Sequence, residues 1–393
     1  MATPTLHTHR PNFPLLFTFI GLVILGTIII SSASVALSIQ NASNPNFYFK
    51  EHLLSLLLGL PFFFFGFKVD YSFWKKIAPL LILGALLLMV AVFIPGIGTS
   101  YGTFAHRWIA LGPINFAPAE IFKLALVVYF SAWFTKRQAE VKSFVGSTVP
   151  FLAIMIVAAI LIMKQPDLGT MLVVAITSGI LYFVAGANML HVLILGGGGV
   201  AAVLALIFSS GYRTERLMIF LNPSSDVSGT GYQINQALLA IGTGGLFGLG
   251  FGQSRQKFNY LPEASSDSIF AVASEELGFL RVSLIVLAFL FIAIQGYKVA
   301  QKAPDTFSRL LATGITSWIV VQGFLNIAAM LSLVPLTGIP LPFISMGSSS
   351  TIVLMLGVGI LLNISRHTEG ETRESSSFRR RYWWAYFTGF GRN

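Results

Sequence analysis

The stretch FPLLFTFIGLVILGTIIISSASVAL, from Phe13 to Leu37, decides the fold class of this chain. It contains no charged residue, and it is longer than the roughly 20 apolar residues that a helix needs to cross a bilayer core. A signal peptide is the competing interpretation. However, the run is about twice the length of a normal signal-peptide core and lacks a persuasive cleavage site. We therefore predict a retained first membrane helix.

Nine further apolar runs follow, so the sequence predicts ten membrane spans. Their approximate bounds are Leu53–Phe67, Ile77–Ile94, Ala119–Phe134, Val149–Met163, Gly169–Val184, Leu190–Phe208, Leu280–Ile294, Ala312–Leu333 and Ser348–Leu362. The composition agrees, because 55% of the residues are hydrophobic and only 10% are charged, whereas an ordinary soluble domain has about 25% charged residues. The predicted fold class is an all-α polytopic membrane protein.

The basic residues predict how the spans are oriented. With the N-terminus in the cytoplasm, sixteen of the 25 Lys and Arg residues fall in cytoplasmic segments, as the positive-inside rule requires. Both termini are then cytoplasmic, and the long loop between the seventh and eighth spans, about 209–266, is extracytoplasmic. We expect a cytoplasmic segment at 1–12, a membrane domain at 13–365 and a cytoplasmic basic and aromatic tail at 366–393.

The tail contains the run FRRRYWWAYF, from Phe378 to Phe387. It is either an anchor to the lipids of the inner leaflet or a disordered tail whose charge serves only topology. The net charge of +10 does not indicate nucleic-acid binding, because the basic residues lie in short loops that flank spans and in this tail. The chain has no cysteine, which excludes disulfides and thiolate chemistry.

Four of the 15 carboxylates lie within the run YLPEASSDSIFAVASEELG, from Tyr260 to Gly278. They are Glu263, Asp267, Glu275 and Glu276. Since the apolar neighbours of these residues make each charge costly to desolvate, the cluster is the strongest indication of chemistry in the chain.

Asp267 is expected near the outer start of the eighth span. There it is either a general base or a helix cap, and Ser265 or Ser266 is a further candidate for the cap. Glu275 and Glu276, two turns deeper, are expected to be structural partners of Arg281 or Lys257.

Charged residues also occur at membrane depth near the fourth span. Glu120 and Lys123 are three residues apart, so on a helix they share a face and can pair. Such a pair either only fixes packing or belongs to a site. Arg107, Lys164 and Asp167 are expected at the same outer end of the bundle, where they would form a net positive pocket for an anionic lipid head group.

Glycine and proline mark three special segments. Gly196–Gly199 predicts close helix packing, and Gly242–Gly252 predicts a re-entrant or tightly turned segment. The segment GIPLPFISMGSSS, Gly338–Ser350, predicts irregular and re-entrant backbone. The sequence shows no HExxH motif, Cys/His cluster or recognised Ser/His/Asp arrangement, so metal ligands stay unassigned.

Five segments, read together, resemble the SEDS family of shape, elongation, division and sporulation proteins. They are RWIALGPINFAPAEIFKLALV (Arg107–Val127), QPDLGT (Gln165–Thr170), GYQINQALLAIGTGGLFG (Gly231–Gly248), QKFNYLPEASSDSIFAV (Gln256–Val272) and GIPLPFISMGSS (Gly338–Ser349). Their order and spacing cover nearly the whole membrane region. The motif QK..YLPEA resembles the sequences of the division branch, FtsW, more than those of the elongation branch, RodA.

The resemblance implies a ten-helix peptidoglycan glycosyltransferase of the bacterial cytoplasmic membrane. Such an enzyme polymerises lipid II into glycan strands at the outer face during cell division and releases undecaprenyl diphosphate. The implied partners are lipid II, the undecaprenyl-linked glycan, a class B penicillin-binding protein that crosslinks the strands, and other divisome proteins. A lipid II flippase or transporter is the first alternative, since charges at membrane depth also mark substrate paths. A non-catalytic division scaffold is the second.

The resemblance also assigns roles to residues. Asp267 matches the essential aspartate of the family, which would deprotonate the acceptor sugar hydroxyl. The family's charged cavity residues are matched by Arg107, Glu120 and Lys123. The remaining candidates for binding substrate or diphosphate, or for lining the cavity, are Gln165, Asp167, Glu263, Ser345 and Ser349. Cationic side chains, and a divalent cation such as Mg²⁺ or Mn²⁺, are the candidates for stabilising the leaving diphosphate.

Overall fold

The computed structural model describes residues 10–99, 107–111, 114–208, 211–222, 229–258 and 260–367. The predictions for residues 1–9 and for most of the tail, 368–393, lie outside the described residues. The helices, in chain order, are α1 (Phe13–Ala33), α2 (Val35–Ala42), α3 (Phe47–Lys68), α4 (Tyr71–Ala91), α5 (Pro118–Lys136), η1 (Gln138–Glu140), η2 (Phe144–Thr148), α6 (Val149–Lys164), α7 (Leu168–Val184), α8 (Met189–Phe208), α9 (Gly211–Leu221), α10 (Thr230–Gly244), α11 (Ile269–Gln301), α12 (Thr306–Met330) and α13 (Ser348–Arg366).

Ten of these helices correspond to the ten predicted spans. Within the described residues, nine helices are long and apolar enough to cross a membrane, and α7 is a shorter apolar helix. The prediction of an all-α polytopic membrane protein is confirmed. Several helices extend beyond the apolar runs; α3, for example, begins at Phe47 rather than Leu53, because helix geometry continues into the polar residues at the end of a span.

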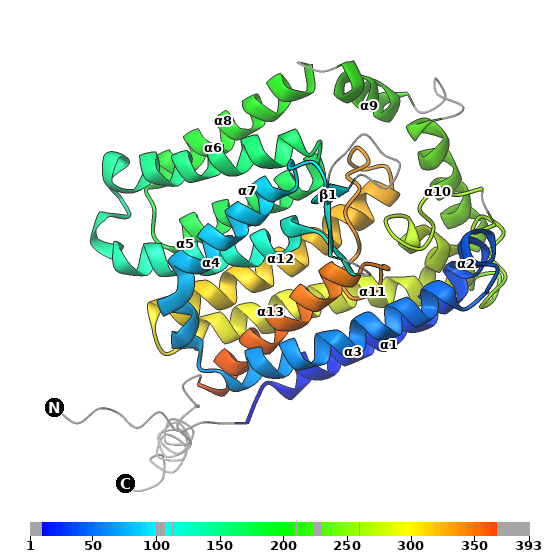
Figure 1. The fold of residues 1–393 in the computed structure, drawn as a ribbon, viewed down its shortest axis with the longest axis horizontal. Helices are drawn as coiled ribbons and strands as arrows, with labels where there is room; N and C mark the ends of the chain where they lie inside the picture. Colours follow the sequence, from blue (N-terminus) through cyan, green and yellow to red (C-terminus); the bar gives the residue numbers. More distant parts are fainter. Residues whose placement is uncertain are drawn as a thin grey trace, which may run out of the picture.

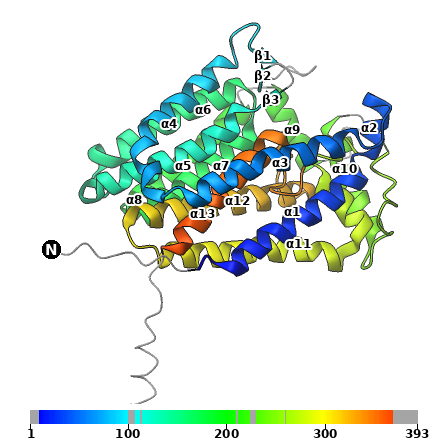
Figure 2. The ribbon, with the colours of Figure 1, turned by 60° about the horizontal axis from the view of Figure 1, so that its bottom comes forward.

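The centre of the bundle consists of α5, α12 and α13 (Figures 1 and 2). Their most apolar windows are 72–78% buried, against 22–33% for α1, α3, α4, α6 and α11. The outer helices expose large apolar side chains such as Phe17 and Leu80, as expected of surfaces that face lipid rather than water.

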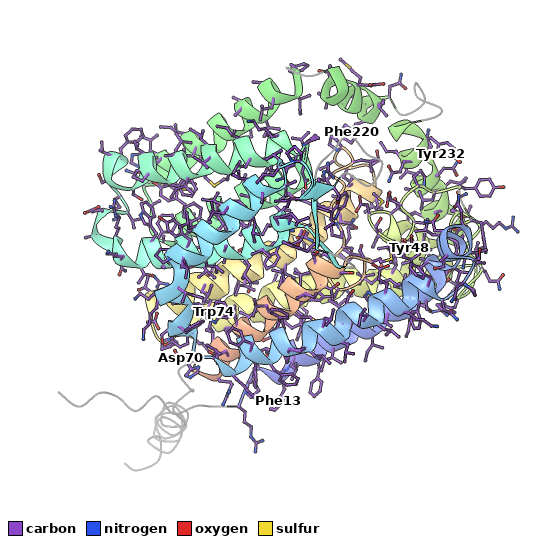
Figure 3. The ribbon with its side chains drawn as sticks, viewed as in Figure 1. Phe13, Tyr48, Asp70, Trp74, Phe220 and Tyr232 are labelled. Carbon is purple, nitrogen blue, oxygen red and sulfur yellow. The ribbon has the colours of Figure 1, made fainter. Side chains whose placement is uncertain are left out.

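The start of α1 and the end of α13 lie together. The backbone N–H of Asn12 donates to Oγ of Ser365 at 3.0 Å. Figure 3 shows Phe13 at this end of the bundle, while Tyr48 and Tyr232 lie at the opposite end. An even number of crossings brings both ends of the described chain to the same side.

A small antiparallel sheet, which the sequence analysis did not predict, lies between α4 and α5. It has the order β1 (Gly98–Thr99), β2 (Trp108–Leu111) and β3 (Ile114–Phe116). Ile109 pairs with Gly98 on one side and with Phe116 on the other. The sheet leads the chain into α5, which begins at Pro118, a residue suited to a first helical turn.

In the long connection after α8, α10 and the described backbone that follows it pack against α11. The connection contains α9 and α10, followed by irregular backbone. The N–H of Leu249 donates to the carbonyl of Glu275 at 2.9 Å, and the N–H of Phe279 donates to that of Gly245 at 2.8 Å. Between these bonds α11 is interrupted at Gly278, whose φ of 77° lies in the left-handed region. The predicted span Leu280–Ile294 is therefore the part of α11 after this break.

The expected close packing at Gly196–Gly199 is wrong. A Cβ built on any of these four glycines would meet nothing within 4 Å, and none of the most apolar window of α8 is buried. Glycine permits close approach but does not require it, and here α8 lies at the edge of the bundle (Figure 1).

Candidate functional site

Asp267 lies two residues before α11, beside α10. Nε2 of Gln233, in α10, donates to Oγ of Ser268 at 3.0 Å. The expectation that Ser265 or Ser266 caps the helix is wrong. The cap position is Ser268, and its side chain makes no capping bond, because its Oγ donates to the carbonyl of Pro262 at 2.9 Å.

The segment between α12 and α13 is irregular, as predicted, and it packs against the Asp267 loop. Oγ of Ser345 donates to the carbonyl of Ser266 at 2.6 Å and accepts from the N–H of Leu341 at 2.8 Å. The N–H of Met346 donates to the carbonyl of Ser265 at 2.9 Å. The candidate Ser345 therefore joins the two segments.

The side-chain amide of Asn326, in α12, connects the backbone of Asp267 to the backbone of the irregular segment. Nδ2 of Asn326 donates to the carbonyls of Asp267 and Ile339, both at 2.8 Å. The neighbouring Gly338 has a φ of +66°, and a Cβ on it would lie 3.5 Å from Oδ2 of Asp267. The carboxylate thus faces the backbone of the irregular segment, and its own side chain is partly exposed.

Glu120 and Lys123 form the predicted pair, with Nζ of Lys123 2.9 Å from Oε1 of Glu120 and both side chains buried. Nζ also donates to Oε1 of Gln322 at 2.7 Å. The same oxygen accepts from Nε1 of Trp318 at 3.0 Å, while Nε2 of Gln322 donates to the carbonyl of Pro340 at 3.0 Å. The charged pair is therefore connected to the segment that faces Asp267.

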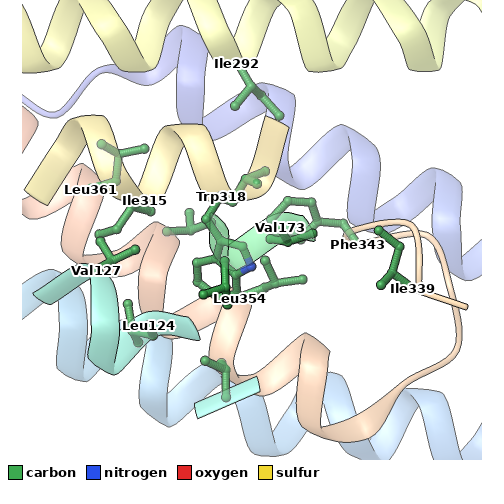
Figure 4. Close-up of a cluster of buried hydrophobic side chains, with 14 of the residues drawn as sticks. Leu124, Val127, Val173, Ile292, Ile315, Trp318, Ile339, Phe343, Leu354 and Leu361 are labelled. Carbon is green, nitrogen blue, oxygen red and sulfur yellow. The ribbon is translucent and has the colours of Figure 1, made fainter. Parts of the chain in front are cut away.

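The ring of Trp318 lies among the buried apolar side chains of the core (Figure 4). A small cavity of about 10 Å³ adjoins it. It lies between α5, α7 and α12, and its lining residues are Lys123, Leu126, Val127, Val173, Val174, Thr177, Ser178 and Trp318. Asp267 does not line this cavity, which has room for about one water molecule.

Arg107 lies against the turn between α6 and α7, beside Lys164 and Asp167, and the net positive pocket expected there stays a prediction. Nε and Nη2 of Arg107 donate to the carbonyls of Gln165 and Pro166 at 3.0 and 2.6 Å. Lys164 is exposed. The side chain of Gln165 contacts Met89.

Asp167 caps α7 by accepting from the N–H and the hydroxyl of Thr170 at 2.9 and 2.8 Å. Asp167 and Gln165 thus each have a structural partner. The role of both residues in binding substrate stays a prediction.

Two candidates stabilise loops near the site. Glu263 is exposed and has a φ of +53°; its carboxylate accepts from the hydroxyl of Ser266. Oγ of Ser349 accepts from the N–H of Ala117 at 3.0 Å, which joins the starts of α13 and α5.

Both deeper carboxylates have structural partners, and the predicted partner is found for Glu276 but not for Glu275. Oε1 of Glu276 lies 2.9 Å from Nζ of Lys257, and both side chains are buried. Ser32, in α1, joins them by donating to Glu276 and accepting from Lys257. Glu275 accepts from the hydroxyl of Ser254. Arg281, the other expected partner, donates instead to the carbonyl of Phe247 at 3.0 Å.

The described part of the chain contains no group of three or more His, Cys, Asp or Glu side chains that could hold a metal ion. The carboxylates of the cluster are divided between separate contacts, so the residues present do not assemble a divalent-cation site by themselves.

Residues 13–370 match the family model of FtsW, RodA and SpoVE, described as cell cycle proteins. The chain belongs to this family. It is thus a SEDS protein, as the five sequence segments indicated. It is 40% identical over 358 residues to stage V sporulation protein E of Bacillus subtilis, covering 91% of this chain and 98% of that protein. It is 37% identical over 361 residues to a probable peptidoglycan glycosyltransferase FtsW of Geobacter sulfurreducens, covering 92% and 96%.

Solved structures share the fold of this SEDS protein. A chain from a structure described as "Structural coordination of polymerization and crosslinking by a peptidoglycan synthase complex" matches with a TM-score of 0.76 and 24% identity, covering 91% of this chain and 98% of that one. The rod shape determining protein RodA of Thermus thermophilus matches with a TM-score of 0.67 and 24% identity, covering 92% and 98%.

Sequence reasoning missed two residues of the site in this SEDS protein, Gln322 and Asn326. The available signal was two amides four residues apart in the apolar run TSWIVVQGFLNIAAM, Thr316–Met330. That spacing places both on one helix face, and buried amides need hydrogen-bond partners.

Proposed function

We propose that this SEDS protein is a peptidoglycan glycosyltransferase that polymerises lipid II into glycan strands during cell division. The family membership supports this, as does 37% identity over 361 residues to a protein named probable peptidoglycan glycosyltransferase FtsW. The reaction takes place at the outer face of the bacterial cytoplasmic membrane and releases undecaprenyl diphosphate.

Asp267 is the proposed general base. The arrangement of Asp267 carries this assignment: the residue is partly exposed, its backbone is fixed by Asn326, and its carboxylate faces Gly338. The other deep carboxylates, Glu275 and Glu276, are buried in structural contacts. A base must be both accessible and positioned, and within the cluster Asp267 meets both requirements.

In the proposed reaction, Asp267 takes the proton of the acceptor sugar hydroxyl of lipid II. The oxygen attacks the anomeric carbon of the growing strand and forms the new glycosidic bond. The bond between that carbon and the diphosphate breaks, and its electron pair leaves with undecaprenyl diphosphate. Fixed positive charge stabilises such a leaving group. Arg107, which is half-buried, is the proposed direct contact of the diphosphate. The positive charge of the buried Lys123 is proposed to stabilise the diphosphate at longer range.

The orientation and partners are also proposals. The sixteen basic residues assigned to cytoplasmic segments favour cytoplasmic termini and an outward Asp267 loop. A class B penicillin-binding protein is the proposed crosslinking partner, since a structurally similar chain comes from a complex that coordinates polymerization and crosslinking. Other divisome proteins are expected to join it.

The test is to incubate the purified protein and its cognate class B partner with lipid II, beside Asp267→Asn. Asparagine keeps the shape of the side chain and removes its basicity. Long strands from wild type and none from the variant would support the proposal. Transbilayer movement of lipid II without polymer would favour a flippase. Normal division in cells that carry only Asp267→Asn would favour a scaffold.

A further inference from the structure

Two amides on α12 connect the charged pair of α5 with the Asp267 loop. Gln322 and Asn326 are one helical turn apart, with exposed fractions of 0% and 1%. Gln322 binds Lys123 and Pro340, and Asn326 binds Asp267 and Ile339. Consecutive carbonyls of the irregular segment are thus held by consecutive turns of one helix.

The chemistry of the partners fixes the orientation of both amides. Asn326 faces two carbonyl oxygens, which accept but never donate, so its NH₂ group must point toward them. Oδ1 of Asn326 is buried and has no hydrogen-bond partner among the described residues. A buried acceptor without a partner costs about 1–3 kcal/mol. The two carbonyls that its NH₂ group joins offset this cost and connect the Asp267 loop to the irregular segment.

We propose that Asn326 is a positioning residue for the glycosyl transfer and that Gln322 supports it. The inference rests on the proposed function of Asp267. Asn326 fixes the distance between the Asp267 backbone and the backbone at Ile339, and so sets where the carboxylate meets the acceptor hydroxyl. Gln322 holds the next carbonyl, at Pro340, and links this geometry to Lys123.

A misplacement of about 1 Å at a reacting group can cost about 100-fold in rate. Asn326→Leu keeps the branched shape of the side chain, although leucine is larger, and removes both donated bonds, so it frees the two backbone segments from each other. The expected result is a fall in kcat of ten-fold or more with the KM for lipid II within two-fold, because Asn326 is buried and does not contact substrate.

The chain offers a matched control in α13. Asn363 is 2% exposed, its Nδ2 donates to the carbonyl of Phe67 at 2.8 Å, and its Oδ1 likewise lacks a partner among the described residues. Asn363→Leu therefore removes an equivalent bond between α13 and the end of α3. Its unfolding temperature should fall, though less than that of Asn326→Leu, because Asn363 donates one bond and Asn326 donates two, while its kcat should stay within two-fold of wild type.

A second variant keeps the inference testable if Asn326→Leu fails to fold. Gln322→Glu keeps the oxygen that accepts from Lys123 and Trp318 but loses the bond to Pro340. We expect it to lower kcat about five-fold without changing KM. Where Asn326→Leu folds, the double variant should lose a smaller factor in kcat than the product of the losses in the two single variants.

The outcomes separate this inference from the proposed function. If wild type polymerises lipid II, Asp267→Asn does not, and Asn326→Leu has the kcat of Asn363→Leu, only the positioning role is overturned. A loss that appears in KM alone also overturns it. If wild type and Asp267→Asn both make no strands, the proposed function fails and the inference falls with it.

Discussion

Gly338 lies against the carboxylate of Asp267, with the position of its missing Cβ 3.5 Å from Oδ2. Its φ of +66° is in the left-handed region, where a side chain costs about 1–3 kcal/mol. The residue that faces the proposed base thus has no side chain, and its backbone conformation is one that glycine adopts more easily than other residues. Both the position and the conformation of this backbone are constrained.

Gly338→Ala should lower polymerisation more than it lowers stability. The backbone must shift to relieve strain, and the shift changes the surface that faces Asp267. We expect a loss of five-fold or more in strand synthesis, measured with lipid II. Gly186→Ala is the control, because Gly186 has a φ of +96° and open space around it in the turn between α7 and α8. Equal activity losses in the two variants would contradict this prediction.

Lys257→Met should destabilise the protein strongly. It leaves Glu276 as a buried carboxylate without its cation, and breaking such a pair costs about 3–5 kcal/mol. The double variant with Glu276→Met should recover part of the loss, since it removes both charges. Thermal unfolding in detergent measures both effects.

The exposed pair of Arg137 and Glu140, 3.8 Å apart, provides the comparison for this buried pair. An exposed pair contributes about 0–1 kcal/mol, so Arg137→Met should unfold close to wild type. Similar unfolding temperatures for Lys257→Met and Arg137→Met would refute the structural role assigned to Lys257.

The spans and the pairing of Glu276 with Lys257 were predictable from two general rules. Apolar runs of sufficient length form membrane helices, and buried carboxylates require partners. The small sheet was not predictable, since Trp108–Leu111 and Ile114–Phe116 are too short to show a strand pattern. The role of Asn326 was not predictable either, because it depends on the carbonyls of Asp267 and Ile339, which lie in other segments of the chain. The sequence of an apolar helix does not show which backbone groups a polar side chain on it will contact.

The packing of the glycines of α8 was also not predictable from the sequence, because glycine permits close helix packing without requiring it. These glycines give a further prediction. Gly197→Ala should leave activity and stability unchanged or slightly improved, because nothing lies within 4 Å of its Cβ position and alanine is the better helix former. Gly26→Ala, in α1, should be severely impaired, since its Cβ would lie 2.3 Å from the carbonyl oxygen of Phe343. Thermal unfolding and strand synthesis would test both, and a harmful Gly197→Ala would restore the packing interpretation.

Asp70 should make stability depend on pH at the other end of the bundle. Its carboxylate caps α4 by accepting from the N–H of Ser72 at 2.7 Å. Burial acts to raise the pKa of Asp70, but the hydrogen bonds from Ser72 and the positive charges of His367 and Lys76 outweigh it, so the pKa is lowered. The charged form is therefore favoured in the folded protein.

Because the folded-state pKa of Asp70 is lowered, its contribution is complete above the unfolded pKa of about 3.9 and is lost as the pH falls through the folded value. Asp70→Asn keeps a good cap but cannot titrate. Between pH 6 and pH 3, the unfolding temperature of wild type should therefore fall more than that of the variant. Asp70→Ala, which removes the cap, should lose about 1 kcal/mol at pH 7. Parallel acid curves for wild type and Asp70→Asn would mean that other carboxylates carry the acid sensitivity.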